Sequence, residues 1–267
     1  MKSTLNDINM RLKVLFFAIV LAVASVQTAD AQSSFRSRPR GGYTSIQRLD
    51  TGFGVSFGWA NSVYRTTEWS TDEVERDPAL NGFYLGVTKD FTLIRHALFL
   101  QAGLYYTYLN DERNKELAAG IKVIGDRTEH LLNLPVRVKY SYQITPKIGV
   151  FAYAGPTFVA GLSSNLKYRA KLTEDHSVAA SYGYYTGKVK SDDLPAAMQT
   201  WFDEQKPQSK YNRFDILMGG AIGAEFFKVL EVHLGYDWGL IDRLRGDIAE
   251  DFTMLRNQFY LSVGLRF

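Results

Sequence analysis

The chain has 267 residues, of which 46% are hydrophobic, and it carries no cysteine and a formal net charge of +3. This small net charge gives no indication of nucleic-acid binding, and the ordinary hydrophobic fraction excludes a bundle of membrane helices. Without cysteine, the fold has neither disulfides nor a lipoprotein anchor, so backbone pairing and packing must stabilise it. Aromatic residues and glycine are plentiful, with 16 Tyr, 17 Phe, 4 Trp and 22 Gly.

The N-terminal region has the three parts of a secretory signal peptide. Residues 14–26 are continuously apolar, basic residues precede them, and small residues follow. The apolar run is shorter than the roughly 20 residues that a spanning helix needs. We therefore predict a signal peptide over residues 1–31, with Ala29 and Ala31 at the cleavage site and Gln32 as the first mature residue. A retained anchor helix is the alternative.

Two further boundaries follow from composition. Residues 32–49 are rich in Ser, Arg and Gly and are predicted to form a flexible, basic linker in the periplasm. Residues 50–267 are predicted to form one domain. The basic region of the signal peptide begins directly after Met10, so translation starts either at Met1 or at Met10.

From residue 50 onward, apolar residues recur at every second position, which is the period of a β-strand. In residues 51–59, for example, Phe53, Val55, Phe57 and Trp59 alternate with glycine and serine. The facing of one segment, residues 147–162, is left open. The pattern predicts eight strands of about 8–14 residues, near the length that crosses a bilayer at a tilt; they cover residues 51–59, 81–87, 98–108, 131–142, 147–162, 213–227, 230–238 and 257–267.

The connections between these strands alternate in length. Those after the second, fourth and sixth strands are short, whereas the other four are long and cover residues 60–80, 110–126, 162–212 and 240–256. Short turns on one side and long loops on the other are typical of an up-and-down transmembrane barrel. The sequence therefore predicts an all-β, eight-stranded antiparallel barrel with long extracellular loops and short periplasmic turns. Its even strand count places both termini in the periplasm.

The second face of the strands distinguishes a membrane barrel from a soluble one. A soluble barrel would carry many Lys, Glu and Thr residues on its outer face. Here that face is small and polar with isolated charges of both signs, which suits the narrow lumen of an eight-stranded barrel. We expect these charges to pair across the lumen, because an unpaired buried charge is costly. The predicted lumen network comprises Arg137, Lys139, Asp215, Glu225, Glu231, His233, Asp237 and Arg266.

Several stretches resemble the outer membrane protein β-barrel domain family, which includes the PorT-like small barrels. The likeness covers residues 50–267 and is carried by "HLLNLPVRVKY" from residue 130, "YAGPTF" from 153, "FDILMGGAIGAEF" from 214, "LGYDWGLIDR" from 234 and the terminal strand. The resemblance implies a location in the outer membrane of a Gram-negative cell and names no catalytic residue. For PorT-like members it implies a part in protein secretion.

Two features of the strands lead to local predictions. Pro135 lies inside a predicted strand, and since a closed barrel has no edge to accommodate a missing N–H, we predict a β-bulge there. The last strand ends on Phe267 and also carries Phe259 on its lipid face. A terminal aromatic resembles the signal by which outer-membrane barrels are recognised, so this strand is predicted to contact the barrel-assembly machinery.

Residues 191–205, in the longest loop, carry a helical pattern. Leu194, Met198, Trp201 and Phe202 fall on one stripe, and Pro195 suits the first helical turn. This helix is predicted either to bind a partner protein or cover the barrel mouth, or else to pack against its own loop.

The leading functional hypothesis is a non-enzymatic envelope protein with a structural or protein-interaction role, in contact with outer-membrane lipids. A narrow porin for small solutes is the alternative. A barrel enzyme acting on lipid or peptide is a third, since His233 should share a face with Glu231 and Asp237. The four histidines lack metal-ligand spacing, and neither a metal, a cofactor nor nucleic acid is expected.

Overall fold

The structure is a computed structural model that describes residues 52–68, 70–71, 74–76, 79–94, 97–116, 122–171, 177–192, 200, 202 and 210–267. The predicted signal peptide, with Ala29, Ala31 and Gln32, and the predicted linker lie outside the described residues.

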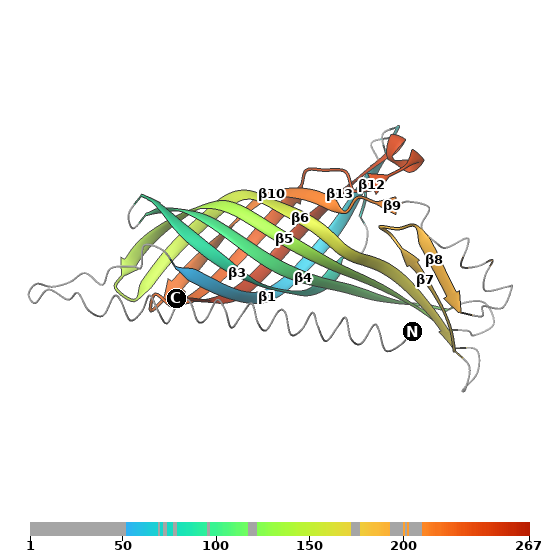
Figure 1. Cartoon of the computed structure of the whole chain (residues 1–267), viewed down its shortest axis with the longest axis horizontal. Coiled ribbons are helices and arrows are strands. Elements are labelled where there is room, and N and C mark those ends of the chain that lie inside the picture. Colours follow the sequence, from blue (N-terminus) through green and yellow to red (C-terminus); the bar gives the residue numbers. More distant parts are fainter. Residues whose placement is uncertain are drawn as a thin grey trace, which may run out of the picture. The chain divides into compact units, whose positions relative to one another are not determined.

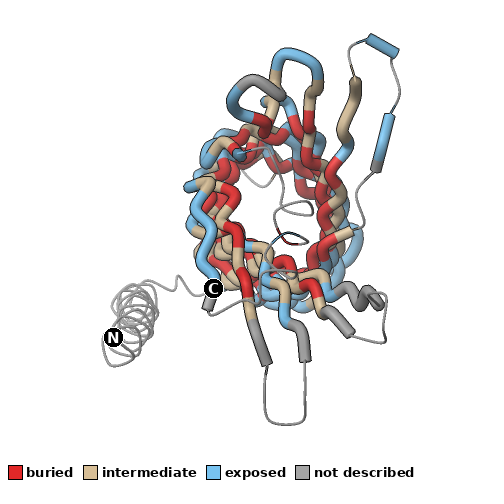
Figure 2. The backbone as a smooth tube through the Cα atoms, turned by 90° about the vertical axis from the view of Figure 1, so that its right-hand side faces the viewer, coloured by how far each residue is buried: buried red, intermediate tan, exposed pale blue. Residues whose placement is uncertain are grey.

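Eight antiparallel strands form a closed ring (Figures 1 and 2). Each strand pairs with its neighbours in chain order, and β6 also pairs with β10, while β13 returns to β1. The predicted eight-stranded up-and-down barrel is therefore confirmed. Its strands are β1 (Phe53–Glu68), β3 (Leu80–Ile94), β4 (Leu98–Glu116), β5 (Lys122–Thr145), β6 (Ile148–Lys171), β10 (Phe214–Phe226), β11 (Leu230–Gly239) and β13 (Phe252–Arg266).

Smaller elements extend the barrel at one end, where Figure 1 shows β7, β8, β9 and β12. The strand β2 (Val74–Arg76) pairs with β1, and the hairpin of β7 (Ser177–Gly183) and β8 (Lys188–Asp192) continues the sheet from β6. A two-stranded sheet joins β9 (Lys210–Tyr211) to β12 (Leu244–Arg245), and the 3-10 helix η1 spans Asp247–Glu250. Within the described part of the chain, no helix is long and apolar enough to span a membrane.

The alternation of short and long connections is confirmed, but the strands reach further into the long ones than predicted. The short turns follow β3, β5 and β10. In contrast, β4 and β5 continue into the predicted loop 110–126, and β5 and β6 are 24 residues long, where about 9–11 suffice to cross a bilayer. The strands stay paired beyond the end of the apolar pattern, because backbone hydrogen bonds do not depend on the side chains. The wall therefore projects well beyond an apolar band.

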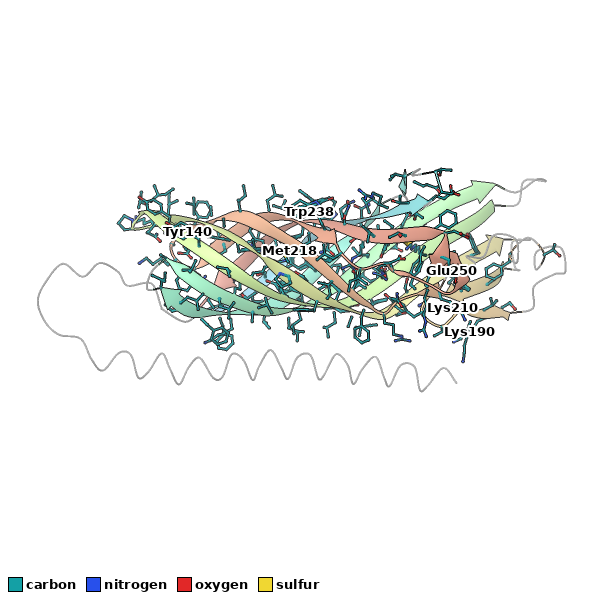
Figure 3. The ribbon with its side chains drawn as sticks, turned by 90° about the horizontal axis from the view of Figure 1, so that it is seen from above. Tyr140, Lys190, Lys210, Met218, Trp238 and Glu250 are labelled. Carbon is teal, nitrogen blue, oxygen red and sulfur yellow. The ribbon has the colours of Figure 1, made fainter. Side chains whose placement is uncertain are left out.

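The apolar face of the strands points outward, as predicted. Phe57, Val138 and Ile222 are exposed, whereas the residues beside them face a filled interior. In Figure 3, Tyr140, Met218 and Trp238 project from the outside of the barrel. Polar residues replace the apolar ones towards the long-loop end, where the Asn61 amide donates a hydrogen bond of 2.8 Å to Asn81. The apolar band thus has a polar border on that side.

The predicted bulge at Pro135 is wrong. Pro135 pairs with Thr157 and Val138 with Ala154 in one constant register, and the ladder is only interrupted between them. Gly155, with φ of 155°, faces this interruption, and a Cβ there would lie 2.4 Å from the Val136 carbonyl oxygen. The close approach of two backbones at this glycine accommodates the missing N–H without an extra residue.

The register of β5 against β6 shifts instead near Leu162. His130 pairs with Ser163 and Leu131 with Gly161, so Leu162 is the extra residue of a bulge. Before it, Phe151 and Tyr153 face inward; after it, the facing alternates from Ser164. Within residues 148–162 the odd-numbered residues face inward throughout. Their facing could not be read from the sequence because both faces carry apolar residues, such as the inward Phe151 and the outward Val150.

Aromatic rings fill the interior by lying over glycines of neighbouring strands. A Cβ on Gly235 would lie 2.2 Å from the Tyr260 ring, and one on Gly223 would lie 2.4 Å from the Phe151 ring. Bulky inward residues therefore depend on small ones opposite them. This packing accounts for the abundance of glycine and tyrosine in the sequence.

We expect Gly235→Ala to lower the free energy of unfolding by about 1–3 kcal/mol, because the added methyl group displaces the buried Tyr260 ring. Gly149→Ala is the matched control, since its Cβ would meet the flexible end of Gln143 at 3.0 Å and the Tyr142 carbonyl oxygen at an ordinary contact distance of 3.4 Å. Urea unfolding of both variants in lipid vesicles measures the effect. Equal stability of the two variants would show that the ring has room to move.

Candidate functional site

The barrel interior contains a balanced set of buried charges. Among the described residues, six cationic and six anionic side chains are buried. Because the two signs are equal in number, pairing across the lumen can neutralise the interior. The cations are Arg127, Arg137, Lys139, Arg243, Arg256 and Arg266, and the anions are Asp90, Glu129, Asp215, Glu225, Glu231 and Asp237.

Four buried charges near the short turns contact one another, and we call them the ionic box: Asp90, Lys139, Glu231 and Arg266. The Lys139 ammonium lies 2.7 Å from Glu231 and 3.6 Å from Asp90. Arg266 lies 2.9 Å from Glu231 and also contacts Asp90. Gln101 donates a further hydrogen bond of 2.8 Å to Asp90. Two acids and two bases from β3, β5, β11 and β13 thus cross-link the lumen.

A second layer follows along the same strands. The Arg137 guanidinium donates hydrogen bonds to Asp237 at 2.9 Å and Thr157 at 3.0 Å, and it lies 4.7 Å from the centre of the Tyr153 ring. The sequence places Arg137 and Asp237 on the lumen face, and the structure brings them into contact. Glu225 is also buried in the interior.

The surroundings of His233 differ from those of an acid–base site. Its Nε2 lies 3.2 Å from the Tyr84 hydroxyl and contacts the Ser262 hydroxyl. Glu231 and Asp237, which were expected on its face, instead bind Lys139, Arg266 and Arg137. His233 is thus hydrogen-bonded within the polar filling.

A third group closes the barrel at the long-loop end, and we call it the cap: Tyr64, Glu129, Tyr185 and Arg243. Arg243 lies 2.8 Å from the Glu129 carboxylate and donates a 3.1 Å hydrogen bond to the Tyr185 hydroxyl. Tyr185 and Tyr64 both donate to Glu129, the former at 3.0 Å. The β7–β8 turn and the β11–β13 connection are thereby tied to the β5 wall.

The protonation states in the cap are fixed by its surroundings. Burial, together with the neighbouring Glu129 carboxylate, raises the pKa of the Tyr185 hydroxyl. Burial disfavours the charged form of Arg243, but Tyr64 and Glu129 outweigh it and raise the pKa of this guanidinium. Tyr185 therefore remains a donor and Arg243 a cation at physiological pH.

Aromatic rings surround Arg127, another buried cation beside the cap. The Arg127 guanidinium lies 4.6 Å from the centre of the Tyr64 ring and 5.0 Å from that of Tyr184. Tyr184 in turn stacks on Tyr211 at 4.4 Å. Such contacts stabilise a buried cation by about 2 kcal/mol or more when they are desolvated.

The sequence prediction missed six interior residues. Asp90 lies three residues beyond the predicted end of its strand. Every second residue from Tyr84 faces the interior, so a longer predicted strand would have included Asp90 as an inward residue. The others lie at or beyond the predicted strand ends, where the lengthened strands and the cap carry them inward. They are Tyr64, Arg127, Glu129, Arg243 and Arg256.

The predicted loop helix is only partly visible. Leu194, Met198 and Trp201 lie outside the described residues. Phe202 is buried and packs edge-on against Tyr168, at 5.8 Å between ring centres. Phe202 therefore contacts the inner side of the projecting sheet.

The projecting sheet also carries an exposed outer surface, formed by the ends of β5 and β6 with β7 and β8. Lys167, Lys188 and Lys190 are exposed on it. Figure 3 shows Lys190, Lys210 and Glu250 together at this end of the barrel. In the described parts of the chain, no group of three or more His, Cys, Asp or Glu residues could hold a metal ion.

A closed barrel with an apolar outside and a charged inside is the architecture of an integral outer-membrane protein. The family comparison agrees, because the model of the outer membrane protein beta-barrel domain matches residues 30–245. The chain belongs to this family, and its place is the outer membrane. No curated protein matches the chain in sequence.

Solved structures of other outer-membrane barrels are similar to the chain at low identity. Ail, the attachment invasion locus protein of Yersinia pestis, is 12% identical, with 82% of this chain and 100% of Ail covered and a TM-score of 0.37. OprG from Pseudomonas aeruginosa is 10% identical, with 84% and 99% covered and a TM-score of 0.42. At these scores the likeness carries no argument about function.

Proposed function

We propose that this protein is a plugged outer-membrane barrel with a structural or protein-interaction role in the cell envelope. The proposal rests on the cross-linked interior: among the described residues it holds six buried charges of each sign, and two groups of ion pairs span the lumen. Such a filling costs desolvation energy that a conducting pore would not need to spend. It suits a rigid scaffold better than a channel.

The projecting sheet is the proposed site of interaction. In this proposal the short turns and both termini face the periplasm, so that β7, β8 and the ends of β5 and β6 stand outside the cell. A sheet held rigidly by the cap presents a preformed surface, which reduces the entropic cost of binding a partner. A secretion-related role, as the PorT-like resemblance implies, would make that partner part of the secretion machinery.

Site-specific photocrosslinking in native membranes tests the interaction. We expect a photoreactive residue at position 190 or 167 to form a discrete adduct with one envelope protein, because both side chains are exposed on the projecting sheet. Position 134, an outward leucine of the apolar band, is the matched control and should capture lipid only. Absence of a protein adduct from correctly assembled barrels at both test positions would contradict the proposal.

A further inference from the structure

A cavity of about 30 Å³ lies inside the barrel, next to the ionic box. Arg137 and His233 are part of its wall, and each stands two residues along its strand from a member of the box, Lys139 and Glu231 respectively. The wall also includes Asn133, Asp237 and Gln258, and the residues Tyr84, Tyr105 and Tyr260.

Six residues of this wall carry a buried polar atom that has no hydrogen-bond partner among the described residues. These atoms are Asn133 Oδ1, Arg137 Nε, His233 Nδ1, Asp237 Oδ1, Gln258 Oε1 and the Tyr260 hydroxyl. A buried polar atom without a partner costs about 1–3 kcal/mol. Six such atoms on the wall of one cavity indicate a bound species that completes their hydrogen bonds.

The chemistry of the wall selects a neutral species. A cation would be repelled by the Arg137 guanidinium, which already lies 2.9 Å from the Asp237 carboxylate. An anion would meet that carboxylate and the amide oxygens of Asn133 and Gln258. A molecule that donates to both amide oxygens and accepts from Arg137 Nε matches the unpartnered atoms, and water has this combination of two donors and two acceptor sites.

The volume agrees with this chemistry. One water molecule needs a cavity of about 10–15 Å³. The cavity of about 30 Å³ therefore has room for about two water molecules. We propose that it is a binding site for ordered water, which links Asn133, Arg137 and Gln258 across the lumen. The layer above the ionic box would then be joined through solvent molecules and not only by direct ion pairs.

X-ray radiolysis of the folded protein tests this site, because radicals formed from bound water oxidise the side chains beside it. Tyr260 lines the cavity and is 3% exposed, whereas Tyr153 is 5% exposed and lies outside the cavity wall. We expect Tyr260 to be oxidised several-fold faster than Tyr153, against the order of their exposure. Equal rates, or a faster Tyr153, would overturn the proposal.

Two variants distinguish bound water from leakage of bulk solvent. Asn133→Leu and Gln258→Leu each replace one acceptor of the bound water by an apolar side chain of similar size, so the water should bind less and the oxidation of Tyr260 should fall to that of Tyr153. If Tyr260 stays fast in a folded variant, its oxidation comes from bulk solvent and the proposal fails. If neither variant folds, the comparison within the unchanged protein decides.

Discussion

Replacing Lys139 by methionine should lower the free energy of unfolding by about 3–5 kcal/mol. Lys139 is fully buried and lies within 4 Å of two carboxylates, those of Glu231 and Asp90. Its removal leaves two buried anions to share the single guanidinium of Arg266, and an uncompensated buried charge carries a penalty of this size. Reversible urea unfolding in lipid vesicles, followed by tryptophan fluorescence, measures the loss.

The same substitution at Lys167 is the control, because that lysine is exposed on β6 and its replacement should change stability by no more than about 0.5 kcal/mol. A second variant, Lys139→Met with Glu231→Leu, removes one cation and one anion together and should recover part of the loss. If Lys139→Met alone proves as stable as the Lys167 control, the ionic box does not hold the barrel together.

Glu129→Leu should release the cap while leaving the membrane part of the barrel folded. Glu129 is fully buried and accepts hydrogen bonds from Tyr64, Tyr185 and Arg243. Its loss leaves the Arg243 cation without its 2.8 Å partner, at a cost of about 3–5 kcal/mol. Because the β7–β8 hairpin is tied down there through Tyr185, limited proteolysis of whole cells should cut this hairpin much faster in the variant.

Glu112→Leu provides the comparison, since Glu112 is an exposed acid on the neighbouring strand β4. This variant should keep the protease resistance of the unchanged protein. Retention of full resistance by Glu129→Leu would show that the hairpin is held by contacts other than the cap.

Much of the fold follows from one periodicity. Alternation of apolar and small or polar residues, as in β1 and β13, specifies both the strands and their facing, because a one-residue shift would expose the whole interior set. The ends of the strands do not follow from it, since pairing of β4, β5 and β6 continues where the outward residues become polar. The bulge at Leu162 and the unbulged strand at Pro135 depend on the pairing register of β5 and β6, which the sequence alone does not specify.

For a related reason, the sequence did not predict which interior side chains contact one another. All eight residues of the predicted lumen network are buried, but the contacts of Lys139 with Glu231 and of Arg266 with Asp90 join residues 92 and 176 positions apart. Such pairs are set by the stagger of the closed ring. The cap was missed because its members stand in segments read as loops.

The charged interior should close the barrel to ions. Single-channel recording in planar bilayers tests it most directly, with the purified, folded protein and a known eight-stranded porin as the positive control. We expect no steady conductance above that of the bare membrane, because the ionic box, the Arg137–Asp237 pair and the cap all lie across the lumen. Steady, reproducible open channels would contradict the closed interior and favour a narrow porin instead.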